Sequence, residues 1–133
     1  MAKQATSTKA RILSVSRSLF SVHGFDSTTL NDIITASGIT KGSFYYYFKS
    51  KEILCENVID QTAQEYQQLV ASIDKSAEPI AQLQQLVGKI VQLNLSGEWV
   101  NCRLVLRLSL DSHIERPEIQ LKLSDFWQWY RQV

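Results

Sequence analysis

The sequence contains little that could hold a metal ion or carry out catalysis. Its two cysteines, Cys55 and Cys102, and its two histidines, His23 and His113, lie far apart and match no metal-ligand spacing. A nucleophile with a neighbouring base, a carboxylate pair and a glycine-rich phosphate loop are missing as well. We therefore expect a protein without metal, cofactor or enzymatic activity, in which both thiols stay reduced.

Proline and glycine are also scarce, with two and five residues in a chain of 133. No segment alternates between apolar and polar residues as a strand does. Apolar residues recur at spacings of three and four instead, as on one face of a helix. No apolar run approaches the ~18 residues of a membrane span, and the polar start lacks the apolar block of a signal peptide. We expect an all-α protein in the cytoplasm, with no membrane contact.

The most informative stretch, residues 28–51, predicts two short helices joined by a tight turn. Thr28 or Thr29 can cap the first helix, because a side-chain oxygen there can accept a hydrogen bond from a free backbone N–H. Gly38 lies where this helix must end, and glycine readily adopts the left-handed conformation found at such ends. Thr40 can cap the second helix. This layout predicts a helix-turn-helix.

The second of these helices has an apolar side and a polar side. At about 100° per residue, Phe44, Tyr47 and Phe48 share the apolar side. The residues expected to face outward are Lys41, Gly42, Ser43, Tyr45 and Tyr46. Gly42 would let the backbone approach a partner closely, and the other four can hydrogen-bond to phosphates and base edges. We expect the N-terminal end of this helix to enter a DNA major groove.

Charge is unevenly distributed along the chain. Residues 1–51 carry seven basic and two acidic side chains, a net charge of +5, whereas the remaining 82 residues have a net charge of −4. A basic surface favours contact with a polyanion. Together with the outward residues of the second helix, this distribution indicates DNA binding rather than a chance imbalance.

Residues 12–54 resemble the DNA-binding domain of the tetracycline-repressor (TetR) family of bacterial transcription regulators. The matching residues are Leu19-Phe20, Gly24-Phe25, Thr28-Thr29, Asp32-Ile33, Ala36, Gly38, Thr40-Lys41-Gly42-Ser43-Phe44-Tyr45, Tyr47-Phe48 and Ser50-Lys51-Glu52. Ile34 departs from the pattern, because the family usually has alanine there. The resemblance implies a phosphate contact at Lys51, and we predict the same for Thr28 and Thr29. The full predicted DNA-contacting set is Thr28, Thr29, Thr40, Lys41, Gly42, Ser43, Tyr45, Tyr46 and Lys51.

The domain prediction is a three-helix, helix-turn-helix head over residues 1–50 and a helical regulatory body over residues 51–133. Within the head, residues 1–7 are expected to form a mobile arm before a first helix over 8–23. Ser50 is the expected N-cap of a long helix that reaches about Ile73.

Three further helices are expected in the body: one from Pro79, one over residues 100–110 and one from Pro117. The chain stops at Val133 within the last helix, whereas members of the resembling family usually continue for two further long helices. We therefore expect the body to be truncated or incomplete.

The resemblance implies that the body forms a homodimer and binds a small-molecule effector, as in a ligand-responsive repressor of a palindromic operator. Aromatic residues of the body could line the effector cavity or belong to the core or dimer interface. Arg103 and Arg107 could hold an anionic ligand or pair with carboxylates of neighbouring helices. The candidate ligand-binding residues are Trp99, Arg103, Arg107, Trp127 and Tyr130. The alternative is a ligand-independent architectural DNA-binding protein, which would lack a closed, aromatic-lined cavity.

Overall fold

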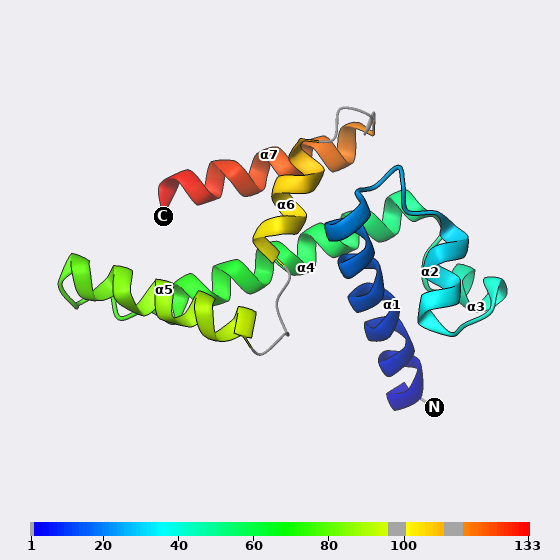
Figure 1. The fold of residues 1–133 in the computed structure, drawn as a ribbon, viewed down its shortest axis with the longest axis horizontal. Coiled ribbons are helices and arrows are strands. Elements are labelled where there is room, and N and C mark those ends of the chain that lie inside the picture. The colour runs from blue at the N-terminus through cyan, green and yellow to red at the C-terminus, as the bar shows by residue number, and fades with distance from the viewer. Residues whose placement is uncertain (1, 96–100, 111–115) are drawn as a thin grey trace.

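The computed structural model describes residues 2–95, 101–110 and 116–133, and the side chains of most of them (Figure 1). These residues form α1 (Ala2–His23), α2 (Leu30–Ser37), α3 (Lys41–Tyr47), α4 (Lys51–Ala71), α5 (Pro79–Leu95), α6 (Asn101–Ser109) and α7 (Pro117–Gln132). No strand occurs in these ranges, so the all-α prediction is confirmed. Within the same ranges, no helix combines the length and apolar character needed to cross a membrane.

The long helix α4 is the element around which the others are arranged (Figure 1). The head helices α1, α2 and α3 lie at its N-terminal end, and α5 turns back along its C-terminal half. α6 packs against α1, and α7 packs against α4. Ser50 caps α4 as predicted, since its Oγ accepts a hydrogen bond from the Ile53 backbone N–H at 3.1 Å.

The first helix is longer than the sequence analysis predicted. We expected a mobile arm over residues 1–7, but α1 already begins at Ala2. Residues 2–8 contain no glycine or proline. An established helix can extend through such a segment, because each added residue brings one more backbone hydrogen bond. The first helix, predicted over residues 8–23, therefore begins earlier than expected.

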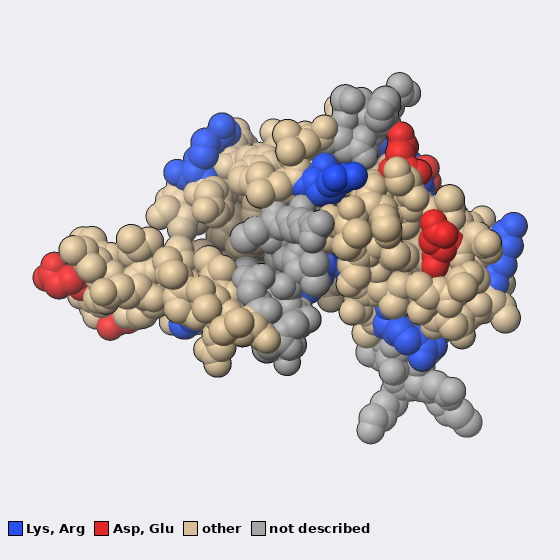
Figure 2. All heavy atoms as spheres, in the orientation of Figure 1, with Lys and Arg blue, Asp and Glu red and all other residues tan. Residues whose placement is uncertain are grey.

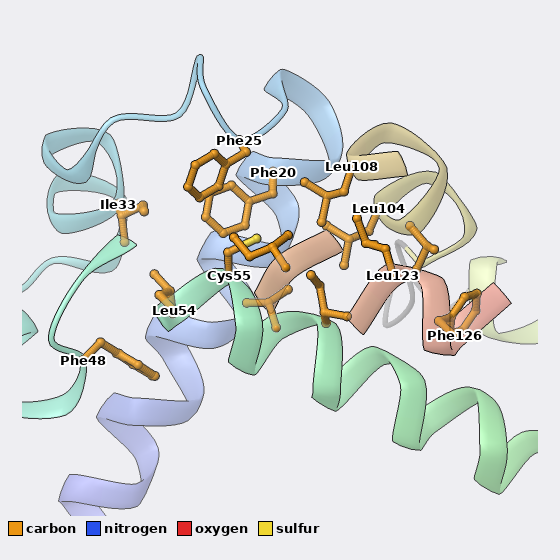
Figure 3. Close-up of a cluster of buried hydrophobic side chains, with 14 of the residues drawn as sticks. Phe20, Phe25, Ile33, Phe48, Leu54, Cys55, Leu104, Leu108, Leu123 and Phe126 are labelled. Carbon is orange, nitrogen blue, oxygen red and sulfur yellow. The ribbon is translucent and has the colours of Figure 1, made fainter. Parts of the chain in front are cut away.

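One cluster of buried side chains extends from the head into the body (Figure 3). Its head side includes Ile33, Phe44 and Phe48, and its body side ends at Phe126. In the middle, Phe20 of α1 lies beside residues of α4 and α6 (Figure 3). Head and body are thus in apolar contact through α1, α4 and α6, in addition to the chain connection at α4.

Ion pairs join α4 to its neighbours at several points. Arg17 of α1 lies 2.9 Å from Glu65, and Lys122 of α7 lies 2.8 Å from Asp60. A hydrogen bond joins α5 to the C-terminal end of α4, since Lys89 donates to the backbone carbonyl of Ser72 at 3.0 Å. These contacts fix how α1, α5 and α7 lie along α4.

Candidate nucleic-acid interface and ligand cavity

A reciprocal pair of hydrogen bonds sets the start of α2. The Thr29 hydroxyl accepts from the Asp32 backbone N–H at 3.0 Å, and the Asp32 carboxylate accepts from the Thr29 backbone N–H at 2.9 Å. The bonds from the Thr29 backbone and hydroxyl stabilise the charged carboxylate and hold the pKa of Asp32 below its ordinary value. This capping box fixes where the chain enters the helix-turn-helix.

The turn between α2 and α3 has the geometry that the sequence predicted. Gly38 adopts φ +66° and ψ 37°, a left-handed conformation that side-chain-bearing residues rarely adopt. Thr40 then caps α3, because its hydroxyl accepts from the Ser43 backbone N–H at 3.1 Å. Both short helices therefore have defined ends, which holds α3 in a fixed direction relative to α2.

α3 separates the two sides that the sequence analysis assigned to it. Phe44 is fully buried and Phe48 nearly so, and Tyr47 is half-buried. Tyr46 is 79% exposed and Tyr45 is 48% exposed. Lys41 and Gly42 are also exposed, and Ser43 is partly so. Phe48 lies just beyond the end of the helix, but its ring still packs 6.0 Å from that of Phe44.

Gly42 is not required by the packing of the protein itself. A Cβ atom built at this position would meet no other atom within 4 Å, and the backbone has no positive φ. Glycine within a helix is destabilising by roughly 0.5–1 kcal/mol relative to alanine. The open space at Gly42 therefore lies on the outside of α3, where an external partner could approach.

Thr28 does not reach the surface on which Thr29 lies. Its side chain is fully buried, and its hydroxyl donates to the carbonyl of Gly24 at 2.7 Å. In this conformation the Thr28 side chain has no exposed surface, and its phosphate contact stays a prediction. The residue belongs instead to the loop between α1 and α2, which its hydroxyl closes.

Lys51 is also engaged within the protein. Its ammonium group donates to the carbonyl oxygens of Phe25 at 3.0 Å and Thr28 at 3.1 Å, and it lies 4.1 Å from the centroid of the Phe25 ring. Lys51 thus ties the loop between α1 and α2 to the start of α4. A phosphate contact of this residue stays a prediction.

The basic charge of the head is only partly available to a polyanion. Arg17 is buried against Glu65, and Lys51 is held by carbonyls. The basic residues whose side chains are exposed in the described part of the head are Lys9, Arg11, Lys41 and Lys49. Figure 2 shows basic side chains at the outer and lower edges of the head. The usable charge therefore lies near α3 and along α1.

The body contains a cavity of about 470 Å³ between α4, α5, α6 and α7. Its lining residues are Tyr66, Val70, Leu86, Ile90, Val105, Leu106, Phe126, Trp127, Trp129, Tyr130 and Val133. None of these side chains carries a charge. Phe126 is central to the aromatic wall, with the rings of Tyr66 and Trp127 each 5.3 Å from its own. The Trp127 indole N–H is already used, since it donates to the Ser109 hydroxyl at 2.7 Å.

Two of the five predicted ligand-binding residues, Trp127 and Tyr130, line this cavity. Arg107 does not, because its guanidinium donates to the carbonyl of His23 at 3.3 Å. A ligand contact of Arg107 stays a prediction. Trp99 lies outside the described residues, and so does the side chain of Arg103.

Comparison with known proteins agrees with this geometry. The sequence model of a family described as "Bacterial regulatory proteins, tetR family" matches residues 12–58. Residues 12–58 therefore belong to the TetR family. The resemblance drawn from the helix-turn-helix residues is thereby confirmed.

Individual relatives are similar to this chain beyond the head as well. An uncharacterised helix-turn-helix transcriptional regulator in the lacX 3′ region of Lactococcus lactis subsp. lactis is 32% identical over 121 residues, 86% of this chain and 62% of that protein. A crystal structure of a gamma-butyrolactone receptor (ArpA-like protein) has a TM-score of 0.69 and 28% identity, covering 86% of this chain and 59% of that one. This chain therefore spans about three-fifths of the length of these two proteins.

The fold of the head and body together is shared with more distant TetR-family structures. Regulatory protein TetR from Rhodobacter sphaeroides superposes with a TM-score of 0.80 at 18% identity, over 92% of this chain and 66% of that one. At this level of identity the likeness shows the fold alone. The arrangement of the seven helices in the described ranges is therefore shared with that structure.

Sequence reasoning missed most of the aliphatic side of the cavity. The missed residues are Val70, Leu86, Ile90, Val105 and Leu106. Their three- and four-residue spacing is the same for a cavity wall as for a filled core, so the pattern alone could not distinguish the two. The aromatic residues near the end of the chain were the only usable signal.

Proposed function

We propose that this protein is a transcriptional regulator that binds double-stranded DNA with α3 in the major groove. The observation that carries the proposal is the division of α3 into a buried side, with Phe44, and an exposed side, with Tyr46 and the open space at Gly42. The exposed side of this short, capped helix carries tyrosines beside a glycine that the packing of the protein does not require. Such a surface is well suited to bind a partner. The groove of B-DNA admits such a helix.

Within this proposal the outward residues of α3 have different tasks. Lys41 and Ser43 lie in the first turn, where they can donate to phosphates or base edges. Tyr45 and Tyr46 can place hydroxyl groups and ring edges against bases. Thr29 and Thr40 are the N-caps of α2 and α3, and we assign them to phosphate contacts that set the register without reading sequence.

A single short helix reads only a few base pairs, so we propose that the protein acts as a homodimer on a palindromic operator. In a two-fold dimer the two α3 helices would lie about one DNA turn apart, roughly 34 Å, or a multiple of it. Repression is the mode we propose. Because the proposed partner is DNA and the family is bacterial, we place the protein in the bacterial cytoplasm.

We propose further that the cavity binds a neutral, mainly apolar effector. The described lining carries no charged side chain, and four of its residues from α7 are aromatic. A charged ligand would lose its hydration there without gaining an ion pair. The relative that is described as a gamma-butyrolactone receptor supports a body of this fold as a small-molecule receptor.

The proposal is tested by selecting bound sequences from a random DNA pool with the purified protein. A palindromic consensus with half-sites about one turn apart would support sequence-specific binding by a dimer. Enrichment of no sequence would favour the architectural alternative. Failure to retain any DNA would contradict the proposal as a whole.

The effector part is tested separately with the neutral dye N-phenyl-1-naphthylamine. We expect binding to quench the tryptophan fluorescence of Trp127 and Trp129, which line the cavity. Substituting the central ring, as in Phe126→Ala, should change the dye affinity, whereas Tyr46→Ala in the head should not. A dye that binds equally well to both variants would place its site elsewhere.

A further inference from the structure

We propose that Arg107 is a positioning residue that couples the cavity to the DNA-binding head through α6 and α1. The inference rests on the function proposed above and concerns the route by which an effector would act. The helix α4 is the covalent link between head and body. The contact between α6 and α1 is a second connection between them.

One short helix touches both the cavity and the head. Val105 and Leu106 of α6 line the cavity. Leu104 and Leu108, on the neighbouring face of the same helix, are buried, and Figure 3 shows them near Phe20 of α1. Closely packed side chains transmit displacement rather than absorb it. A ligand that pushes on Val105 or Leu106 would therefore move the surface on which α1 rests.

Arg107 joins α6 to the C-terminal end of α1. Its Nη2 atom donates to the carbonyl oxygen of His23 at 3.3 Å. Carbonyl groups in the last turn of a helix lack partners within the helix, and a cation is favoured at this negative end of the helix dipole. Gly24 follows at φ 84°, so the chain changes direction immediately after the bond. Arg107 thus holds α1 at the point where the loop to α2 begins.

The other end of the same loop is held by α4. Lys51 donates to the carbonyls of Phe25 and Thr28, and Thr29 then caps α2. The loop that leads into the helix-turn-helix is therefore attached to α6 at its start and to α4 along its length. A shift of α6 relative to α4 would change the path of the loop and the direction of α2 and α3.

Arg107 can be altered without altering the cavity. Its side chain is exposed and is not part of the lining. Replacement by methionine keeps the length of the side chain and removes the donor, whereas lysine keeps one donor. Arg131 of α7 is an exposed arginine that offers a matched control.

The test is hydrogen exchange of the DNA-free protein with and without N-phenyl-1-naphthylamine, followed in peptides that cover residues 20–29. We expect dye binding to change exchange in this segment of the wild type, and the change to be lost in Arg107→Met. It should persist in Arg107→Lys and in the control Arg131→Met. Dye affinity, measured from tryptophan fluorescence, should be equal in all four proteins.

Three results would overturn the inference while leaving the proposed DNA binding intact. These are an unchanged segment 20–29 in dye-bound wild type, an equal change in Arg107→Met, or a dye affinity that falls with Arg107→Met. The last would show that Arg107 supports the cavity itself rather than the route from it. A dye that does not bind the wild type would instead contradict the proposed effector site, and the inference would fall with it.

Discussion

The head and the body of this protein are stabilised in different ways. In the head and at its border, α2, α3 and α4 each begin after a hydroxyl residue whose side chain accepts a backbone hydrogen bond: Thr29, Thr40 and Ser50. In the body, α7 begins after Arg116, which forms no side-chain cap. Arg116 is held instead by Glu56 of α4 at 3.3 Å. Local caps thus set the starts of α2, α3 and α4, whereas the residue before α7 is held by a distant segment.

Apolar exposure shows the same difference. Along α5, residues on one side leave about half or more of the side chain exposed: Ile80, Leu83, Val87, Val91 and Leu95. The largest exposed apolar residues of the head are instead the tyrosines of α3, together with Val22. In Figure 1, α5 extends to the end of the molecule farthest from α3. In the head, single exposed residues can therefore be assigned individual roles. In the body, the exposed apolar residues form a group along one helix and must be interpreted together.

The largest effect on stability is expected from a substitution on the buried side of α3. Phe44→Ala removes a fully buried ring and should lower the free energy of unfolding by about 3–5 kcal/mol. Tyr46→Ala, two residues away on the exposed side, should leave the melting temperature nearly unchanged. Thermal or denaturant unfolding of the two variants checks the prediction. The reverse order of stability would mean that the two sides of α3 are wrongly assigned.

The outer side of α3 should matter for DNA instead. Tyr46→Ala should weaken binding to the selected operator by roughly 1–3 kcal/mol, because a contact with a base edge is lost. Binding to random DNA should change far less. A titration of both DNAs at one salt concentration measures this difference. Equal losses on the two DNAs would assign Tyr46 to the phosphate backbone.

Lys51 and Lys41 compare a lysine held within the protein with an exposed lysine that we propose to contact DNA. Lys51→Met removes two hydrogen bonds from an ammonium group and should lower the free energy of unfolding by about 1–3 kcal/mol. Lys41→Met should leave stability unchanged and reduce the slope of log affinity against log salt by about one unit. Unaltered melting of Lys51→Met would refute its role in holding the loop.

A smaller effect of opposite sign is expected at Gly42. Gly42→Ala should stabilise the free protein by about 0.5–1 kcal/mol, since the added Cβ meets no atom. The same variant should bind DNA more weakly, because the methyl group projects from the outer side of α3. Gly88→Ala in α5 is the matched control, with equally open space. It should gain similar stability with no effect on DNA binding.

The smallest effect concerns the capping box of α2. The bonded carboxylate of Asp32 has a lowered pKa, so it contributes stability above the ordinary pKa of about 3.8. That contribution is lost as the pH falls through the lower, folded-state pKa. Asp32→Asn should therefore show a slightly weaker dependence of melting temperature on pH in the acid range. An identical pH profile in the two proteins would show that the carboxylate is not held in solution.

The sequence predicted those features that depend on neighbouring residues. The caps at Thr29, Thr40 and Ser50, the turn at Gly38 and the two sides of α3 follow from local spacing and are confirmed. Family membership could be recognised for the same reason, because the diagnostic residues lie within one continuous stretch.

Features that depend on distant contacts could not be predicted. Thr28 matched a family pattern, yet its burial depends on how the loop after α1 folds back on Gly24. The partner of Arg107 lies 84 residues away, and no local rule connects the two. The cavity could not be predicted either, because its walls come from four helices. The spacing of apolar residues does not specify how these helices pack together.

The continuous apolar cluster of Figure 3 has a consequence for how this protein unfolds. Ile33 in the head and Phe126 in the body belong to the same contiguous cluster. If the packing at one end is lost, the other end therefore loses part of its packing as well. Unfolding should then be a single cooperative event rather than two. A cavity created at Phe126 would lower the amount of intact protein in the cell, and with it the occupancy of DNA by residues at the opposite end of the molecule.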